Sequence, residues 1–418
     1  MINQIRQLFR YFNSIEQLLL VLLFVLLPSQ IGKHFWPDFA SIFSLRVDYF
    51  SPVIYLWDLL LIGLLIVWFI GKPKINQSAL SLGFVFLLSQ IASLVFTDNL
   101  EIGLVRLEQL FLMVGFGVYL ASQKWIKIRS AIVLGFSVGL LIQALLVIYQ
   151  FGFGKTLGWW WLGEREFNLN TTGIATFNWY GQVFLRPYGT FSHPNVLAGV
   201  SLLMVLSLIL AEWRRWWMVG ITSVMILLTF SRTAIIGLLG LSLVLWNGVN
   251  RWLVGLLVLS SPLLLVRFWS ALNFDYLSWL RRNELVEAAQ LIWRDNLWFG
   301  VGLNSFIIEM ANNQLISGAN RFLQPVHNVG WLLLAETGIV GLIGFGIMIA
   351  GVLFQLLKYR RHKLVFILWC GWIAIAWVGL WDHYWLTLAQ GQRMLWCWWG
   401  LSLAIIVKIS DEDYKKGN

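Results

Sequence analysis

The chain has 418 residues, of which 59% are hydrophobic and only 12% are charged. An ordinary soluble domain is about half apolar and about a quarter charged, so this composition excludes a soluble globular protein and predicts an integral membrane protein. The formal net charge of +10 requires no nucleic acid as a partner, because basic loops that face anionic lipid account for such a surplus. Membrane lipid is the partner that we expect for these loops.

Long apolar runs without period-two alternation predict an all-α fold, since only helices and closed barrels satisfy the backbone polar groups in hydrocarbon. A helix of about 20 residues crosses the bilayer. We therefore predict a single membrane domain over 1–418 with about twelve transmembrane helices. The runs lie near 15–32, 54–71, 79–97, 102–122, 131–152, 194–211, 216–230, 231–247, 252–268, 327–357, 364–382 and 393–408.

Lysines and arginines in the short connections predict the orientation. They fall in alternate connections, for example at Lys72, Lys124 and Lys358, on the same side as both chain ends. Both termini are therefore predicted to be cytoplasmic. Two large loops, about 153–193 and about 270–326, are predicted to face outward.

No metal or cofactor is expected from the sequence. The two cysteines, Cys370 and Cys397, lie inside apolar runs, and no His/Cys spacing typical of a metal site occurs. The acidic triplet Asp411-Glu412-Asp413 lies in the predicted cytoplasmic tail, and the outward loops contain no such triplet. These observations argue against a divalent-metal mechanism.

A few polar residues fall inside or beside the predicted spans, where an ionised group is costly unless it is paired or faces a cavity. Asp58 and Arg106 lie near the outer ends of their spans, so we expect that they meet as an ion pair that holds two helices together. Gln143, Gln150 and Glu336 are expected to form hydrogen bonds between helices.

The first outward loop ends in the sequence RPYGTFSHPN, from Arg186 to Asn195. Gly189 permits a tight turn there, and Pro194 suits the first turn of the following helix. Arg232 lies at the outer end of the eighth run. Its plain interpretation is a side chain that extends to the membrane interface.

The second outward loop contains an amphipathic stretch that begins at Arg281 and Arg282. Apolar residues recur at helical spacing from Leu285 to Ile292, so we expect a helix that lies on the membrane surface. His327 then stands at the mouth of the tenth run. Gly338, Gly341 and Gly344 follow it at three-residue spacing, which predicts close packing against another helix.

Together these segments resemble successive signatures of the O-antigen ligase and O-antigen polymerase family. The similar segments are RPYGTFSHPN from Arg186, SRTA from Ser231, the stretch from Arg282 to a terminal Gly-Val-Gly, and HN-x9-G-x2-G from His327. They occur in the family's order and cover about residues 180–345. Many relatives have a proline before the Gly-x-Gly, where this chain has Leu297.

The resemblance implies a GT-C-like membrane glycosyltransferase of the bacterial cytoplasmic membrane, with its site facing the periplasm or exterior. The donor would be a glycan on a polyprenyl pyrophosphate carrier. The acceptor would be a hydroxyl of lipid A-core, of another glycan or of a protein, and the sequence does not decide between ligase, polymerase and protein-glycosylating activity. His327, Arg232 and Arg282 are the implied catalytic residues.

Other residues are expected to bind the substrate. They are Arg186, His193, Asn195, Arg281, Asn328, Asp382 and His383.

The residue types fit this chemistry on their own account. Charge accumulates on phosphate oxygens as the anomeric bond breaks, and a guanidinium binds phosphate through a planar fork without a metal. A neutral imidazole at His327 can accept the proton of the acceptor hydroxyl or hydrogen-bond the pyrophosphate. Asp382 or His383 is its expected partner. The alternative from another class is a transporter or flippase of lipid-linked sugars.

Overall fold

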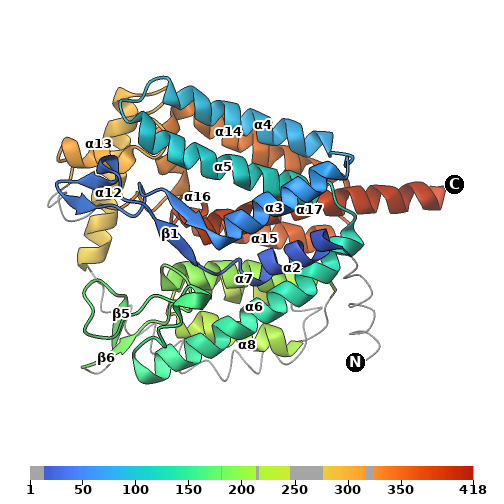
Figure 1. Ribbon diagram of the computed structural model, residues 1–418, viewed down its shortest axis with the longest axis horizontal. Helices are drawn as coiled ribbons and strands as arrows, with labels where there is room; N and C mark the ends of the chain where they lie inside the picture. The colour runs from blue at the N-terminus through green and yellow to red at the C-terminus, as the bar shows by residue number, and fades with distance from the viewer. Residues whose placement is uncertain (1–13, 180, 213–215, 245–275, 317–322, 418) are drawn as a thin grey trace.

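A computed structural model describes residues 14–179, 181–212, 216–244, 276–316 and 323–417. The described chain is mostly helical (Figure 1). Its α-helices are α2 (Ile15–Val25), α3 (Leu56–Ile70), α4 (Gln77–Leu94), α5 (Leu100–Ala121), α6 (Trp125–Phe153), α7 (Pro194–Leu210), α8 (Trp216–Leu228), α9 (Arg232–Val244), α12 (Tyr276–Asp295), α13 (Phe306–Asn312), α14 (Val329–Lys358), α15 (Lys363–Gly379), α16 (Tyr384–Thr387) and α17 (Ala389–Gly417).

Three small antiparallel sheets interrupt the helical pattern. The first pairs β1 (Gly32–His34) with β4 (Val53–Tyr55), and the second pairs β2 (Ser41–Ile42) with β3 (Leu45–Arg46). The third pairs β5 (Thr176–Trp179) with β6 (Gln182–Leu185). All six strands lie in connections between helices, so the predicted all-α architecture holds for the helical bundle but not for these connections.

The protein is a membrane protein. In the described part of the chain, five helices are long and apolar enough to cross a bilayer, namely α4, α5, α6, α14 and α17, and six further apolar helices are shorter. Eleven of the twelve predicted runs coincide with a helix. The run at 252–268 lies outside the described residues.

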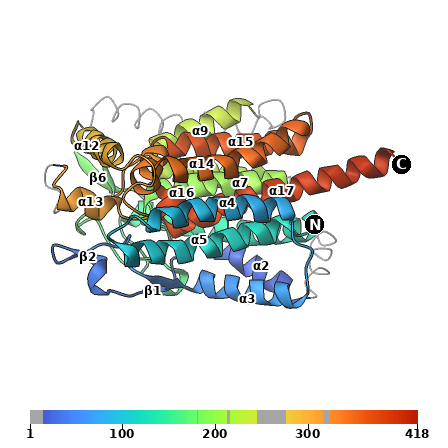
Figure 2. The ribbon, with the colours of Figure 1, turned by 90° about the horizontal axis from the view of Figure 1, so that it is seen from above.

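The strands, α12 and α13 gather at one end of the bundle, whereas the last turns of α17 project from the opposite end (Figures 1 and 2). The connection from residue 26 to residue 55 belongs to the first end and carries four of the strands. The sequence drew attention only to the two longer loops at 153–193 and 270–326. We refer to this end, which holds the strands and α12, as the loop end.

Helix α12 packs on protein and not on the membrane surface, so that prediction was wrong. Leu285, Ala288, Ala289 and Ile292 are all buried. They belong to one hydrophobic cluster with residues of α13, of α14 and of the segment 40–50. An apolar stripe at helical spacing fits lipid and protein equally well, so the sequence alone did not distinguish them.

Helix α14 is interrupted at Gly338, where φ is 62° and ψ is −162°. The segment that follows α12 occupies the break with its backbone. The N–H of Val301 donates to the carbonyl of Ala335 at 3.0 Å, and the N–H of Ile339 donates to the carbonyl of Leu297 at 3.0 Å. Backbone groups that the helix cannot pair internally are therefore satisfied by a loop. Leu297 lies in the turn that leads into this segment.

The expected close packing of the glycine stripe holds for part of it. A Cβ atom on Gly344 would lie 2.0 Å from the Ser89 hydroxyl of α4, so this glycine lets the two helices approach closely. Gly338 has another role. Its backbone is not helical, and a Cβ atom there would lie 2.3 Å from the backbone of Trp298.

Two glutamines that were expected to join helices instead hold the end of the long loop at 153–193. The Gln143 amide donates to the Thr190 hydroxyl and accepts from the Thr190 N–H. The carbonyl oxygen of the Gln150 side chain accepts from the N–H groups of Tyr188 and Gly189, both at 2.8 Å. These bonds fix the turn that leads into α7.

The expected ion pair between Asp58 and Arg106 does not form. The Asp58 carboxylate faces Arg393 of α17, with 3.9 Å between Oδ1 and Nη2. The Arg106 guanidinium donates to the side chains of Gln109 and Asn304 and to the carbonyl of Thr387. The position of a residue along its span does not reveal which neighbouring helix its side chain faces, so the sequence did not predict the correct pair. Arg393 is fully buried, and the sequence did not single it out.

Candidate functional site

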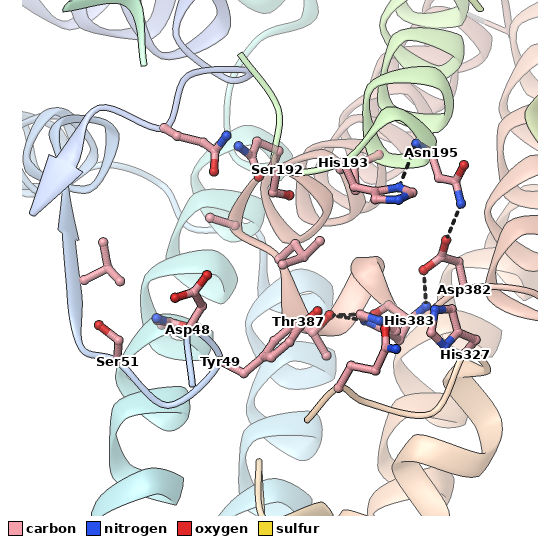
Figure 3. Close-up of a pocket in the computed structure, with 18 of the residues that line it drawn as sticks. Asp48, Tyr49, Ser51, Ser192, His193, Asn195, His327, Asp382, His383 and Thr387 are labelled. Atoms are coloured by element: carbon pink, nitrogen blue, oxygen red, sulfur yellow. Dashed lines mark hydrogen bonds between the residues drawn. The ribbon is translucent and has the colours of Figure 1, made fainter. Parts of the chain in front are cut away.

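A cavity of about 670 Å³ opens at the loop end of the bundle. Its lining comes from connections and helix ends that lie far apart in the sequence. Eight of the ten predicted site residues line it (Figure 3), namely Arg186, His193, Asn195, Arg281, Arg282, His327, Asp382 and His383.

The start of α7 positions two of these side chains. His193 is the N-cap residue, and its Nδ1 accepts the N–H of Asn195 at 3.1 Å while Pro194 takes the first helical position. An N-cap acceptor followed by proline is a favourable helix start. Because Nδ1 is an acceptor, the His193 ring carries its proton on Nε2.

A hydrogen-bonded chain links α7 to the connection after α15. Arg186 donates from Nε to the carbonyl of Thr229 and from Nη2 to Asn195 Oδ1, both at 2.8 Å. Asn195 Nδ2 then donates to Asp382 Oδ2 at 3.3 Å. Asp382 Oδ1 accepts the N–H of His383 at 2.9 Å. The network fixes the orientation of a guanidinium, an amide and a carboxylate in one wall of the cavity.

Hydrogen bonds with Thr387 fix the tautomer of His383. Its Nδ1 lies 2.6 Å from the Thr387 hydroxyl, which itself donates to the carbonyl of His383 at 3.2 Å. The hydroxyl has one proton, so it accepts from Nδ1–H and the unprotonated nitrogen is Nε2. Thr387 is the last residue of the short helix α16. Its carbonyl accepts from Arg106, and this bond anchors α16 to α5.

His327 precedes α14 and lies against His383, with 5.0 Å between the ring centroids. Its Nδ1 is buried and has no hydrogen-bond partner within the described chain. We expected Asp382 or His383 to be the partner of His327. His383 contacts the His327 ring, but neither residue forms a hydrogen bond with its Nδ1. Asn328, by contrast, is outside the cavity lining. It caps α14 by accepting the N–H of Trp331 and donates to the carbonyl of Leu380.

Burial keeps the imidazoles of the cavity neutral. It lowers the pKa of His193 and of His327 to about 3, and the positive charges nearby act in the same direction. It also lowers the pKa of His383 to about 4, against the opposing effect of Asp382.

The carboxyl of Asp382 stays ionised. Burial alone would raise its pKa, but His383, His327, His193 and Arg282 together bring the pKa below its usual value.

The cavity has a surplus of guanidinium groups. Five arginines line it against two aspartates. Burial lowers the pKa of Arg186 to about 10, and the charges of Arg232 and Arg282 contribute to that shift, so the three arginines lie within electrostatic reach of one another. Arg281 is paired with Glu284 at 3.0 Å. Arg232 lies outside the lining, at the exposed start of α9.

Several lining residues were not singled out as site residues by the sequence. Arg106 was noticed only as a buried charge, whereas Arg165, His34, Asp48 and Gln109 gave no signal. His34 and Asp48 come from the connection between the first two helices. A single polar residue in a short loop has no pattern that distinguishes it from an ordinary solvated one.

His327, Asp382 and His383 are the group in the described ranges whose donor atoms could hold a metal ion, since they lie within 4.8 Å of one another. A tetrahedral zinc shell places its ligand atoms roughly 3.3 Å apart, so the group would have to contract around an ion. The cavity is equipped to bind an anion, to accept a proton and to orient a polar ligand.

Searches against models of known protein families and against curated proteins found no match for this chain.

Proposed function

We propose that the protein transfers a glycan from a polyprenyl pyrophosphate carrier to an acceptor hydroxyl, without a metal ion, at the outer face of the bacterial cytoplasmic membrane. The observation that carries the proposal is the convergence of Arg186, Arg281 and Arg282 with His327 on one cavity. These residues come from three distant segments that resemble the O-antigen ligase and polymerase signatures. The cavity lies at one end of a bundle of apolar helices, where the carrier's tail can remain in lipid.

The arginines suit the diphosphate of such a donor. A guanidinium gives charge-assisted, bidentate hydrogen bonds to phosphate oxygens and remains charged at working pH. Arg186 is held in place by Thr229 and Asn195, so its orientation is set before the substrate arrives. A preorganised donor that stabilises developing charge contributes roughly 10²–10³ in rate.

His327 is the residue that we propose to receive the proton of the acceptor hydroxyl. Burial lowers the pKa of its imidazole and keeps the ring neutral at pH 7, and the negative charge of a bound diphosphate would raise that pKa toward the range in which a base is effective. The residue lines the cavity, and its Nδ1 has no partner among the described residues. The alternative role, a hydrogen bond to the pyrophosphate, uses the same position.

The acceptor distinguishes three related activities, and each remains a candidate: a ligase that uses lipid A-core, a polymerase that uses another glycan, and a protein-glycosylating enzyme. Transport of a lipid-linked sugar is the alternative from another class. The predicted site residues line a cavity at the loop end of the bundle, and this arrangement favours transfer.

The proposal is tested with purified protein in lipid nanodiscs. Carrier-linked oligosaccharide is incubated with each type of acceptor, and the product is identified by its mass. We expect a glycosylated acceptor and free carrier pyrophosphate with the natural chain, and no product with Arg282→Ala. Arg294→Ala, an exposed position on the same helix, is the matched control. Absence of product with every acceptor and the intact chain would count against the proposal.

A further inference from the structure

The cavity has a second wall of different chemistry. His34, Asp48 and Ser51 line it from the connection between α2 and α3. Figure 3 shows Asp48 and Ser51 on the side opposite to His193, Asn195 and Asp382. We call His34, Asp48 and Ser51 the first-loop wall. We call His193, Asn195 and Asp382 the arginine wall, because Arg186 donates a hydrogen bond to Asn195.

The ring of His34 is fixed as a hydrogen-bond acceptor. The Ser51 hydroxyl donates to the carbonyl of Phe35 at 2.9 Å, so it accepts at 3.1 Å from His34 Nδ1. The lone pair of His34 therefore lies on Nε2. The ring also stacks on Trp36, with 5.6 Å between centroids and 13° between planes. Partial burial lowers the pKa of His34, against the opposing charge of Asp48, which keeps the ring neutral at pH 7.

Asp48 offers a second acceptor on the same wall. Its side chain is exposed and makes no hydrogen bond or ion pair with any described residue. Its backbone position is nevertheless held, because the carbonyl of the next residue, Tyr49, accepts from Asn304 Nδ2 at 2.9 Å. Asn304 in turn accepts from the buried Arg106. The carboxylate is thus a free group on a supported backbone.

A wall that presents an imidazole acceptor and a carboxylate unpaired within the described residues is poorly suited to phosphate, whose oxygens are themselves acceptors and carry negative charge. It matches hydroxyl groups, which donate. The two walls therefore select two different chemical groups, an anion on the arginine wall and a polyol on the first-loop wall. Gln109 and Gln390, which also line the cavity, supply amides that can pair with either group.

We infer that His34 and Asp48 bind hydroxyl groups of a sugar that serves as the acceptor. The inference rests on the proposed function and refines it. A nucleophile that displaces a leaving group in line approaches from the face opposite to that group. A pyrophosphate on the arginine wall therefore leaves the first-loop wall as the approach for the acceptor. With this placement His327, which lies beside Asp382 and His383, takes its alternative role, the hydrogen bond to the pyrophosphate. Two acceptors on one wall match the several hydroxyl groups of a sugar better than the single hydroxyl of a serine or threonine side chain, so the acceptor class that we infer is a glycan.

Binding measurements separate the two walls without any need for turnover. The protein in nanodiscs is titrated with inorganic pyrophosphate and, separately, with neutral tetrasaccharides, namely maltotetraose, cellotetraose and chitotetraose. Asp48→Asn keeps the shape but removes the charge, and His34→Phe keeps the stacking on Trp36 but removes the acceptor. Asp38→Asn, an exposed position in the same connection that is outside the cavity lining, is the matched control.

We expect at least one tetrasaccharide to bind the natural chain, and each wall variant to weaken that binding roughly tenfold, as for a lost hydrogen bond to a charged or fixed acceptor. Pyrophosphate binding should persist in both variants and should be lost in Arg282→Ala. The inference is overturned if no tetrasaccharide binds, or if both wall variants bind it as the natural chain does. Failure of pyrophosphate to bind the natural chain would instead contradict the proposed function.

Discussion

The side-chain amide of Asn195 donates to the carboxylate of Asp382, with 3.3 Å between Nδ2 and Oδ2. Asn195 lies in the first turn of α7 and Asp382 follows α15, so this bond joins two segments that are distant in the sequence. Asn195 also accepts from Arg186. A single amide therefore separates a guanidinium from a carboxylate that would otherwise neutralise it, and leaves the remaining N–H groups of Arg186 free for a substrate.

Replacement of this amide should impair transfer more than folding. In Asn195→Leu, Arg186 and Asp382 lose their shared partner and can pair directly, so the positive potential of the cavity falls. We expect a loss of roughly 10–10² in rate, since a charged group loses a fixed hydrogen bond worth about 1.5–3 kcal/mol. Initial rates with carrier-linked substrate measure it. Asn170→Leu, exposed in the same loop, serves as control, and unchanged rates in Asn195→Leu would contradict the role of the bridge.

The arginines should differ in their importance. Arg282 lines the cavity, whereas Arg232 lies outside the lining and contributes to the lowered pKa of Arg186. We expect Arg282→Ala to lower the rate by roughly 10²–10³, and Arg232→Ala to lower it less. Both variants should insert and fold normally, as judged by size-exclusion profile. Equal losses in the two variants would mean that α9 brings Arg232 into contact with the substrate during the reaction.

Chelation of metals should leave transfer unchanged, because we assign the stabilisation of the diphosphate to arginines. Added Zn²⁺ should inhibit instead, since imidazoles and a carboxylate are its preferred ligands and His327, Asp382 and His383 lie within 4.8 Å of one another. Rates are measured with EDTA, then with graded Zn²⁺. His383→Ala should weaken the inhibition. A rate that falls with EDTA and returns with a divalent ion would replace the metal-free mechanism.

Acid should destabilise the protein through its buried imidazoles. The pKa of His193 in the folded chain is about 3, whereas an exposed histidine has a pKa of about 6.5. A lowered folded-state pKa means that stability is complete above pH 6.5 and declines as the pH falls toward 3. We expect the melting temperature in detergent to fall between pH 7 and pH 5.

Variants at two helix caps test this assignment. His193→Asn keeps an acceptor at the start of α7 and should make the melting temperature less sensitive to pH. His362 also caps a helix through Nδ1, which accepts from Leu364, but it lies at the more accessible start of α15. His362→Asn should therefore change the pH dependence less. An equal effect of both substitutions would assign the acid sensitivity to other groups.

Much of the fold follows from hydropathy, but the facing of each helix does not. Apolar runs located eleven of the helices, because burial of the backbone in lipid demands them. The same runs gave no rotational information, so Arg393 and not Arg106 faces Asp58. The apolar stripe of α12 was likewise assigned to lipid although it packs on α13 and α14.

The sequence likewise predicted one part of the candidate site and missed another. Residues in recognisable segments, such as Arg186, Arg282 and His327, were predicted together and line one cavity. His34 and Asp48 belong to no pattern, because their significance comes from a tertiary position that the connection between α2 and α3 acquires only in the folded chain. Sequence therefore predicted residues on the side of the cavity to which we assign anion binding, and it missed the side opposite to it.

The break in α14 offers a matched pair of substitutions in one helix. Gly338 has a backbone conformation that is essentially restricted to glycine, and a Cβ atom would lie 2.3 Å from the backbone of Trp298. Gly346 lies in the regular part of the helix, and a Cβ atom there would have no neighbour within 4 Å. Gly338→Ala should therefore cost at least about 3 kcal/mol through strain and clash, whereas Gly346→Ala should be neutral or slightly stabilising.

Thermal unfolding in detergent compares the two variants. If Gly338→Ala still folds, we expect it to lose transfer activity as well. The segment after α12, which fills the break, links α12 with its Arg282 to α14, and α14 directly follows His327. Tetrasaccharide binding should fall as well, because Asn304, which follows this segment, donates to the carbonyl of Tyr49 and so holds the backbone beside Asp48. A Gly338→Ala protein as stable and active as Gly346→Ala would show that the interrupted helix is not required.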